Sequence, residues 1–213
     1  RAKPDEAALT EVEIQQRFDL DGGLPGRWED TERRALTRAL STLSPAELAT
    51  VQRVHFDREK APRNKGSDQA ALYEQRGCPA SIFVFSSAVR SDRYRFIGEP
   101  DAPDSAVVHA IVHEIGHAFE KAPSRQRACA SLKANGAKKN ALVQDANALA
   151  DDNPILRAYH KALDGLPAPT DYGTTSSSES FAESFALFHV DPNALRRTRP
   201  KVFAWFKAGG GLL

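Results

Sequence analysis

The residues best suited to chemistry form the run His113-Glu114-Ile115-Gly116-His117. In a helix, residues four apart lie on the same face about one turn apart, so both imidazoles can reach a single ion. Zinc accepts imidazole nitrogens at about 2.0–2.1 Å in a tetrahedral site. Glu114 follows the first histidine, and from there its carboxylate can take a proton from water at the metal. The run predicts a zinc centre with His113 and His117 as ligands and Glu114 as general base.

The neighbours of this run make a chance match on a core helix the weaker alternative. The helix is apolar almost all round, through Val107, Val108, Ala110, Ile111, Val112, Ile115, Ala118 and Phe119. Such a helix is buried, and burying histidines and a glutamate without partners costs free energy. His109 lies two turns from His117, so all three histidines cannot bind one ion. We expect His109 to line the wall of the site or to stand behind a ligand.

A site with two histidines needs a third protein ligand. The metzincin pattern requires a glycine at position 120 and a histidine at position 123, where this chain has Glu120 and Pro123. A thermolysin-like chain would place a glutamate roughly twenty residues after the second histidine. The stretch from Ser131 to Asn140 contains no acid. The third ligand is therefore expected further along the chain.

The best candidates for that ligand are Glu179 and Glu183, one turn apart on a predicted helix. Ser176 to Ser178 offer an N-cap for this helix. Much of the rest of it is apolar, and a carboxylate pair on an apolar helix favours a bound cation. Poorer choices are His160, His189 and the pair Asp151-Asp152.

Two motifs together carry a resemblance to a known family. The run His-Glu-Ile-Gly-His-Ala-Phe and the later Tyr-Gly-x-Thr-x-x-x-Glu-x-Phe-Ala-Glu-x-Phe resemble the catalytic domain of the anthrax lethal factor-like zinc metallopeptidases. The resemblance extends from about Ala70 to Phe206, and the first 50 or so residues have no counterpart. It implies a zincin-like fold with Glu179 as the third zinc ligand. It further implies that Tyr172 hydrogen-bonds the oxyanion of the reaction and that Glu183 orients a ligand histidine.

The expected function is that of a zinc-dependent endopeptidase acting on a protein or peptide, as a secreted general peptidase or a toxin or effector module. The alternative is a catalytically inactive zincin-fold binding module of a larger protein, which would be free to lose Glu114 or Tyr172. Substrate is expected to lie extended along an exposed sheet edge. Ser81 to Phe85 is the candidate for that edge, although it could equally be a buried central strand. The basic stretch Lys121 to Asn140 is a solvated helix face or a preference for acidic substrates.

These residues must be positioned by an α+β fold with a small sheet in the N-terminal half and a mostly helical C-terminal half. Alternating and β-branched patterns predict strands at Val51–Phe56, Ala70–Tyr73, Ala80–Phe85 and, more weakly, Tyr94–Ile97. Apolar spacing and caps predict helices over 29–43, from Ser44 onward, from Asp104 or Ser105 to Glu120, and over about 124–134, 140–150, 153–164, 178–189 and 192–207.

Composition limits the remaining possibilities. The 213 residues, 41% hydrophobic and 27% charged, suit an ordinary globular protein. We expect residues 1–50 to form a helical arm or layer packed on a metallopeptidase domain of residues 51–213. The net charge of +1 demands neither nucleic acid nor an acidic membrane as partner. No apolar run reaches the roughly 20 residues of a spanning helix. The expected state is a monomer.

Two further features concern the compartment. The sequence begins at Arg1 and contains no methionine, as in a processed chain, and we expect secretion or delivery outside the cell. Cys78 and Cys129 lack any CxxC spacing. They are either one disulfide in an oxidising compartment or two buried thiols.

Overall fold

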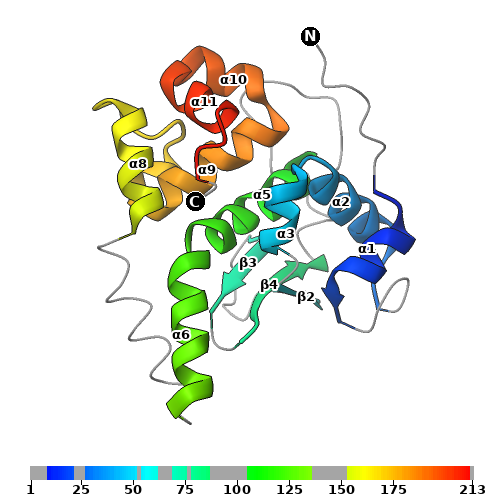
Figure 1. The fold of residues 1–213 in the computed structure, drawn as a ribbon. Coiled ribbons are helices and arrows are strands. Elements are labelled where there is room, and N and C mark those ends of the chain that lie inside the picture. The colour runs from blue at the N-terminus through cyan, green and yellow to red at the C-terminus, as the bar shows by residue number, and fades with distance from the viewer. Residues whose placement is uncertain are drawn as a thin grey trace.

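Helices lie above and to both sides of a small sheet in the view of Figure 1. The computed structural model describes residues 9–21, 27–51, 54–61, 69–75, 78–86, 105–135 and 153–211. Its helix-rich, mixed architecture agrees with the predicted α+β class at that level. The predictions for Tyr94–Ile97 and for 140–150 lie outside the described residues.

The sheet of the described residues has the strand order β1-β2-β4-β3. These strands are β1 (Asp19–Leu20), β2 (Val54–Glu59), β3 (Ala71–Glu74) and β4 (Ala80–Phe85). β1, β2 and β4 run parallel, whereas β3 is antiparallel to β4. Of the two alternatives for Ser81 to Phe85, the exposed edge is therefore wrong and the central strand is confirmed. Its continuous apolar run is that of a central strand covered on both faces, and β3 is the outer strand instead.

Two other expectations need correction at their boundaries. The helix from Ser44 continues as α3 (Pro45–Val51), so β2 begins at Val54 rather than at position 51. The helix predicted over 192–207 is two helices, α10 (Pro192–Thr198) and α11 (Pro200–Lys207). Arg199 between them is non-helical, with φ −141° and ψ 65°, because the residue before a proline is pushed out of the α region.

The helix that carries the two histidines, α5 (Ser105–Glu120), occupies the centre of the fold. It packs on β3 and β4 and on α2 (Asp30–Ser41), and along another side it packs on α9 (Ser177–Val190). Figure 1 shows α1 (Glu11–Arg17) and α2 on one flank and α8 (Pro154–Leu163), α10 and α11 on the other, with α6 (Ala122–Asn135) extending away. Ile14 and Leu36 belong to the same buried core as Ile111 and Phe185.

Aromatic packing fixes the rotation of α9. Phe181 and Phe185 are fully buried, and their rings lie 5.7 and 5.9 Å from that of Phe206. On the α8 side, the Tyr159 hydroxyl lies 2.8 Å from the Ser180 Oγ and 2.7 Å from the Ser184 Oγ. With these residues anchored, the acidic residues of α9 are turned toward α5.

The two cysteines form a disulfide, which decides between the two alternatives left open by the sequence. Cys78, just before β4, is bonded to Cys129 on α6, with their Cα atoms 5.9 Å apart. The bond links the sheet to α6, the helix that follows the histidine helix. The two cysteines are 51 residues apart in the sequence.

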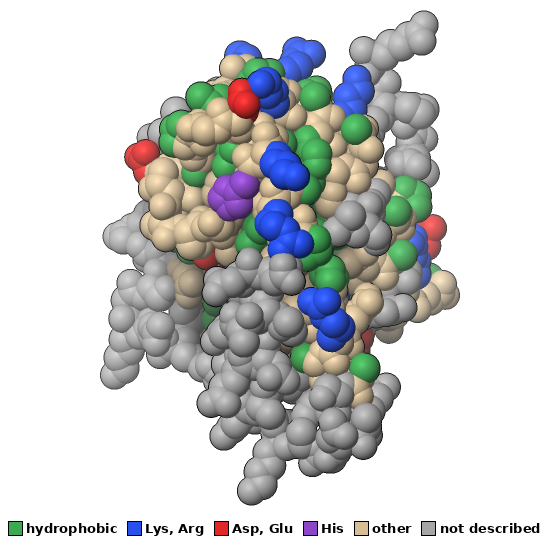
Figure 2. Space-filling view, turned by 60° about the vertical axis from the view of Figure 1, so that its left-hand side comes forward, with side chains coloured by type: hydrophobic (Ala, Val, Ile, Leu, Met, Phe, Trp, Pro, Cys, Tyr) green, Lys and Arg blue, Asp and Glu red, His purple; other side chains and the backbone are tan. Residues whose placement is uncertain are grey.

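The surface over the C-terminal helices is basic. Figure 2 shows Lys and Arg side chains down one face of the molecule, with few acidic side chains between them. Exposed basic residues of α8, α10 and α11 are Arg157, Lys161, Arg196, Arg197, Lys201 and Lys207. Lys201 pairs with Asp164. Within the described residues, no helix has the length and apolar character needed to cross a membrane.

Candidate metal centre

The site depends on an unusually close approach of α5 and α9 at Gly116. A Cβ atom at this glycine would lie 3.1 Å from the Ala182 Cα and 3.3 Å from the Phe185 Cβ. Both distances are tighter than ordinary van der Waals contact. Gly116 thus lets the backbones come near enough for short carboxylate side chains on α9 to reach imidazoles on α5.

Three ligand atoms converge in this contact. The Oε2 atom of Glu179 lies 2.9 Å from the Nε2 of His113 and 3.3 Å from the Nε2 of His117. Ligands at 2.0–2.1 Å around a tetrahedral ion stand about 3.3 Å apart. The group of His113, His117 and Glu179, whose ligand atoms all lie within 4.8 Å of one another, could therefore hold a metal ion with little movement.

Glu183, one turn after Glu179, faces the back of His113. Its Oε1 lies 2.8 Å from the Nδ1 of His113. Its Oε2 accepts a hydrogen bond of 2.8 Å from the Thr170 hydroxyl. When neutral His113 carries its proton on Nδ1 and donates it to Glu183, Nε2 keeps its lone pair. That lone pair then faces the other two ligand atoms.

A second possible metal group, His109, His113 and Glu183, shares two of these residues. The His109 Nε2 lies 3.4 Å from Glu183 Oε1, the same oxygen that faces His113 Nδ1. His109 therefore lies behind His113 rather than beside His117. The spacing argument that one ion cannot bind all three histidines agrees with this placement.

A hydrogen-bonded chain also supports His117, and sequence reasoning missed it. The Nδ1 of His117 lies 3.0 Å from the Ser178 Oγ, and Ser178 donates a 3.0 Å hydrogen bond to the Oε1 of Glu120. The sequence marks Ser178 as part of an N-cap run, and Glu120 as the end of a helix and a departure from the metzincin pattern. No spacing rule connects them, because they meet through the packing of α5 on α9.

Glu114 and Tyr172 lie at the margins of the group. The carboxylate Oε2 of Glu114 accepts a 2.7 Å hydrogen bond from the backbone N–H of Tyr73 in β3. Tyr172 begins a short 3-10 turn (Tyr172–Thr175) just before α9, and its ring centroid is 5.8 Å from that of His113. Its side chain is 54% exposed, so the phenol borders both the ligand group and solvent.

The carboxylates change the protonation of their neighbours. Burial opposes the charged form of His113, but Glu179 and Glu183 outweigh it and raise its pKa to about 10. Burial likewise opposes ionised Glu179, yet His113 and His117 hold its pKa below the usual range. Burial and the nearby carboxylates raise the pKa of Tyr172 to about 12. Tyr172 is thus a neutral hydrogen-bond donor at physiological pH.

The poorer ligand candidates are not brought to this group. His160 is exposed on α8, and His189 lies at the far end of α9, bonded to Thr42 and Glu47. Asp151 and Asp152 lie outside the described residues.

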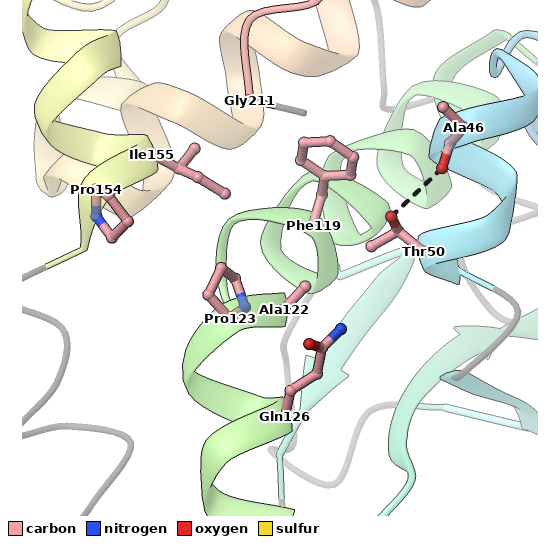
Figure 3. Close-up of a pocket in the computed structure, with 9 residues that line it drawn as sticks. All are labelled: Ala46, Thr50, Phe119, Ala122, Pro123, Gln126, Pro154, Ile155 and Gly211. Carbon is pink, nitrogen blue, oxygen red and sulfur yellow. Dashed lines mark hydrogen bonds between the residues drawn. The ribbon is translucent and has the colours of Figure 1, made fainter. Parts of the chain in front are cut away.

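A cavity of about 460 Å³ lies elsewhere, and none of the six predicted site residues lines it (Figure 3). Apolar side chains such as Phe119, Pro123 and Ile155 line this cavity, along with Thr50 and Gln126.

Comparisons with known protein families, with curated proteins and with solved structures give no match to this chain.

Proposed function

We propose that this chain is a zinc-dependent endopeptidase that hydrolyses a protein or peptide substrate. The observation that carries the proposal is the convergence of two imidazole Nε2 atoms and one carboxylate oxygen between α5 and α9. A set of two histidines and a glutamate with an open fourth position is typical of catalytic zinc in peptidases. The motif resemblance to the lethal factor-like group supports the same assignment.

In this proposal, His113, His117 and Glu179 hold the ion, and Glu183 and Ser178 orient the two imidazoles. Bound zinc supplies a Lewis acid that acidifies water and polarises the carbonyl of the scissile bond. Glu114 accepts the proton of the attacking water and later donates it to the leaving amine. Tyr172, kept neutral by its surroundings, donates a hydrogen bond to the developing oxyanion.

The outer strand β3 is the sheet edge along which we place the substrate. It is the outer strand beside β4 within the described sheet. The backbone N–H of Tyr73, which lies opposite Ile82 of β4, donates to Glu114. An extended peptide that pairs with β3 would therefore pass next to the general base. The ring of Tyr73 is covered by Lys121, whose Nζ is 5.4 Å from the ring centroid.

The alternative is a zincin-fold module that binds a partner without cleaving it. The two proposals agree on the metal and differ only at Glu114 and Tyr172. The presence of both residues at the margin of the ligand group favours the enzyme, because metal binding alone needs neither.

Metal content tests the proposal. Wild type and Glu179→Ala are purified without added metal and subjected to elemental analysis. We expect about one zinc per wild-type chain and a large loss in the variant, since removing one of three protein ligands opens the site. The zinc-loaded wild type is then offered a peptide library, with Glu114→Gln as the inactive control. Absence of metal in wild type, even after zinc is supplied, would refute the proposal. Metal without cleavage would favour the binding module.

A further inference from the structure

The two ligand histidines receive different support. His113 Nδ1 faces a carboxylate directly, at 2.8 Å from Glu183. His117 Nδ1 faces a hydroxyl, at 3.0 Å from Ser178, and the carboxyl of Glu120 stands one hydrogen bond further away. A hydroxyl can donate or accept, so by itself it does not decide which nitrogen of His117 carries the proton.

We propose that Glu120, acting through Ser178, is a positioning residue that sets the metal-binding tautomer of His117. This inference rests on the proposed zinc site. Ser178 has one proton, and its hydrogen bond to Glu120 Oε1 uses that proton. The Ser178 oxygen can then only accept from His117, so the proton of His117 is held on Nδ1. The Nε2 lone pair is left to face Glu179 and the ion.

The direction of the hydrogen bonds from His117 through Ser178 to Glu120 does not depend on the charge of Glu120. The Oε1 atom accepts whether the carboxyl is ionised or carries its proton on Oε2. Without that acceptor, the Ser178 proton could turn toward Nδ1 of His117. The imidazole would then carry its proton on Nε2 and lose the lone pair that a metal requires.

The burial of Glu120 argues that it does more than fill space. The residue is 2% exposed, and burial raises the pKa of its carboxyl. Its Oε2 has no hydrogen-bond partner within the described residues. Burying a carboxyl with so few partners costs free energy. The Glu120 carboxyl accepts a hydrogen bond from Ser178, and Ser178 in turn contacts His117.

Zinc affinity, measured by competition with a chromophoric chelator, tests the inference. Ser178→Ala and Glu120→Ala are each expected to weaken zinc binding by about 10–100-fold, the usual cost of losing a group that orients a ligand. Ser178→Thr and Glu120→Gln keep the hydroxyl and a carbonyl oxygen, and should restore most of the affinity. Thermal unfolding of each metal-free variant identifies any that fail to fold, and Ser178→Ala, the smaller change, remains informative if Glu120→Ala does.

Two matched controls separate positioning from packing. Ser180→Ala removes a buried serine of the same helix that contacts Tyr159 instead of a ligand. Glu47→Gln changes a buried carboxyl that is bonded to a histidine away from the site. Both should leave the zinc affinity unchanged.

A spectroscopic readout reports the tautomer itself. In the zinc-loaded protein with labelled histidine nitrogens, His113 and His117 should each show a protonated Nδ1 with slow solvent exchange. In Ser178→Ala, only the His117 proton should begin to exchange rapidly.

The outcomes are distinguishable. Zinc binding by wild type with unchanged affinity in Ser178→Ala and Glu120→Ala would overturn this inference and leave the proposed function standing. No zinc binding by wild type would overturn both. A selective loss of zinc affinity, together with faster solvent exchange of the His117 Nδ1 proton, would support the positioning of His117 by Ser178 and Glu120.

Discussion

Helix α9 carries two buried histidine–glutamate clusters, one at each end, and they differ in how their polar atoms are satisfied. At its C-terminal end, His189 lies 3.0 Å from the Thr42 carbonyl oxygen and 3.1 Å from Glu47. Each ring nitrogen of His189 therefore has an oxygen partner within hydrogen-bond distance. This cluster joins α9 to α3 and is complete without any ion.

At the N-terminal end, protons alone give a poorer arrangement. Glu179 Oε2 faces the Nε2 atoms of both His113 and His117, whose ring centroids are only 4.8 Å apart. If both Nε2 atoms donated to that oxygen while the Nδ1 atoms donated to Glu183 and Ser178, both rings would be imidazolium and would repel each other. One divalent cation replaces both protons. Burial of a histidine beside a glutamate therefore says little about a metal site, whereas convergence of several ligand atoms on one point marks a group that could hold a metal ion.

The strongest contrast between the clusters should be seen in activity. Glu114→Gln removes the proposed general base and keeps the shape of the side chain, so the rate of peptide cleavage should fall by about 10²–10⁴-fold while zinc content is unchanged. Glu47→Gln, in the other cluster, should retain full activity per folded, zinc-loaded chain. The comparison would fail if Glu114→Gln cleaved as fast as wild type, since Glu114 would then have no part in the reaction.

Stability should show the opposite pattern. His189→Ala removes the histidine partner of the buried Glu47 carboxylate, which keeps its hydrogen bond from the Ser44 backbone N–H. The loss should cost about 3–5 kcal/mol of unfolding free energy. Burial opposes ionised Glu47, but His189 outweighs it and lowers its pKa. The stabilisation from this carboxyl is therefore present above its ordinary pKa and is lost as the pH falls through the lowered value.

Denaturant unfolding of the metal-free protein measures this loss, and zinc affinity serves as the control. A large change in zinc affinity in folded His189→Ala would mean that the two clusters are coupled along α9 and do not act independently.

The sequence predicted the parts of the site that lie on single helices and missed those that depend on packing. His113 and His117 share a face because of helical spacing alone, and Glu179 and Glu183 do so for the same reason. The apolar run at Ala80–Phe85 identified β4 but could not distinguish a central strand from an edge, since that depends on where β3 pairs.

The support for the histidines was hidden for a similar reason. Ser178 and Glu120 are 58 residues apart, and Thr170 reaches Glu183 from a segment before α9. Their roles follow from the distance between α5 and α9, which only the fold sets.

The close approach of α5 and α9 at Gly116 gives a prediction of intermediate size. Gly116→Ala must push Ala182 and Phe185 away by a few tenths of an ångström, which draws Glu179 back from the histidines. We expect a loss of zinc affinity of about tenfold, and a larger one for Gly116→Val. Alanine is the better helix former by about 1 kcal/mol, so the metal-free variant should not be much less stable. Full zinc affinity in Gly116→Val would show that the close contact is dispensable.

The smallest expected effect is the release of protons when zinc binds. Because Glu179 and Glu183 raise the pKa of His113 to about 10, its ring is charged at pH 8 in the metal-free protein. Zinc must displace the proton on Nε2, so binding should release about one proton from this residue.

Calorimetry of zinc binding in buffers with different ionisation enthalpies measures this release. It should persist from neutral pH to about pH 9 and disappear as the pH passes 10. Without metal, the same shift stabilises the fold below the ordinary histidine pKa of about 6.5, and this contribution is lost as the pH rises through the raised value. Zinc binding without proton release at pH 8 would mean that His113 is already neutral. The N-terminal cluster would then be preorganised for the ion rather than held together by protons until the ion arrives.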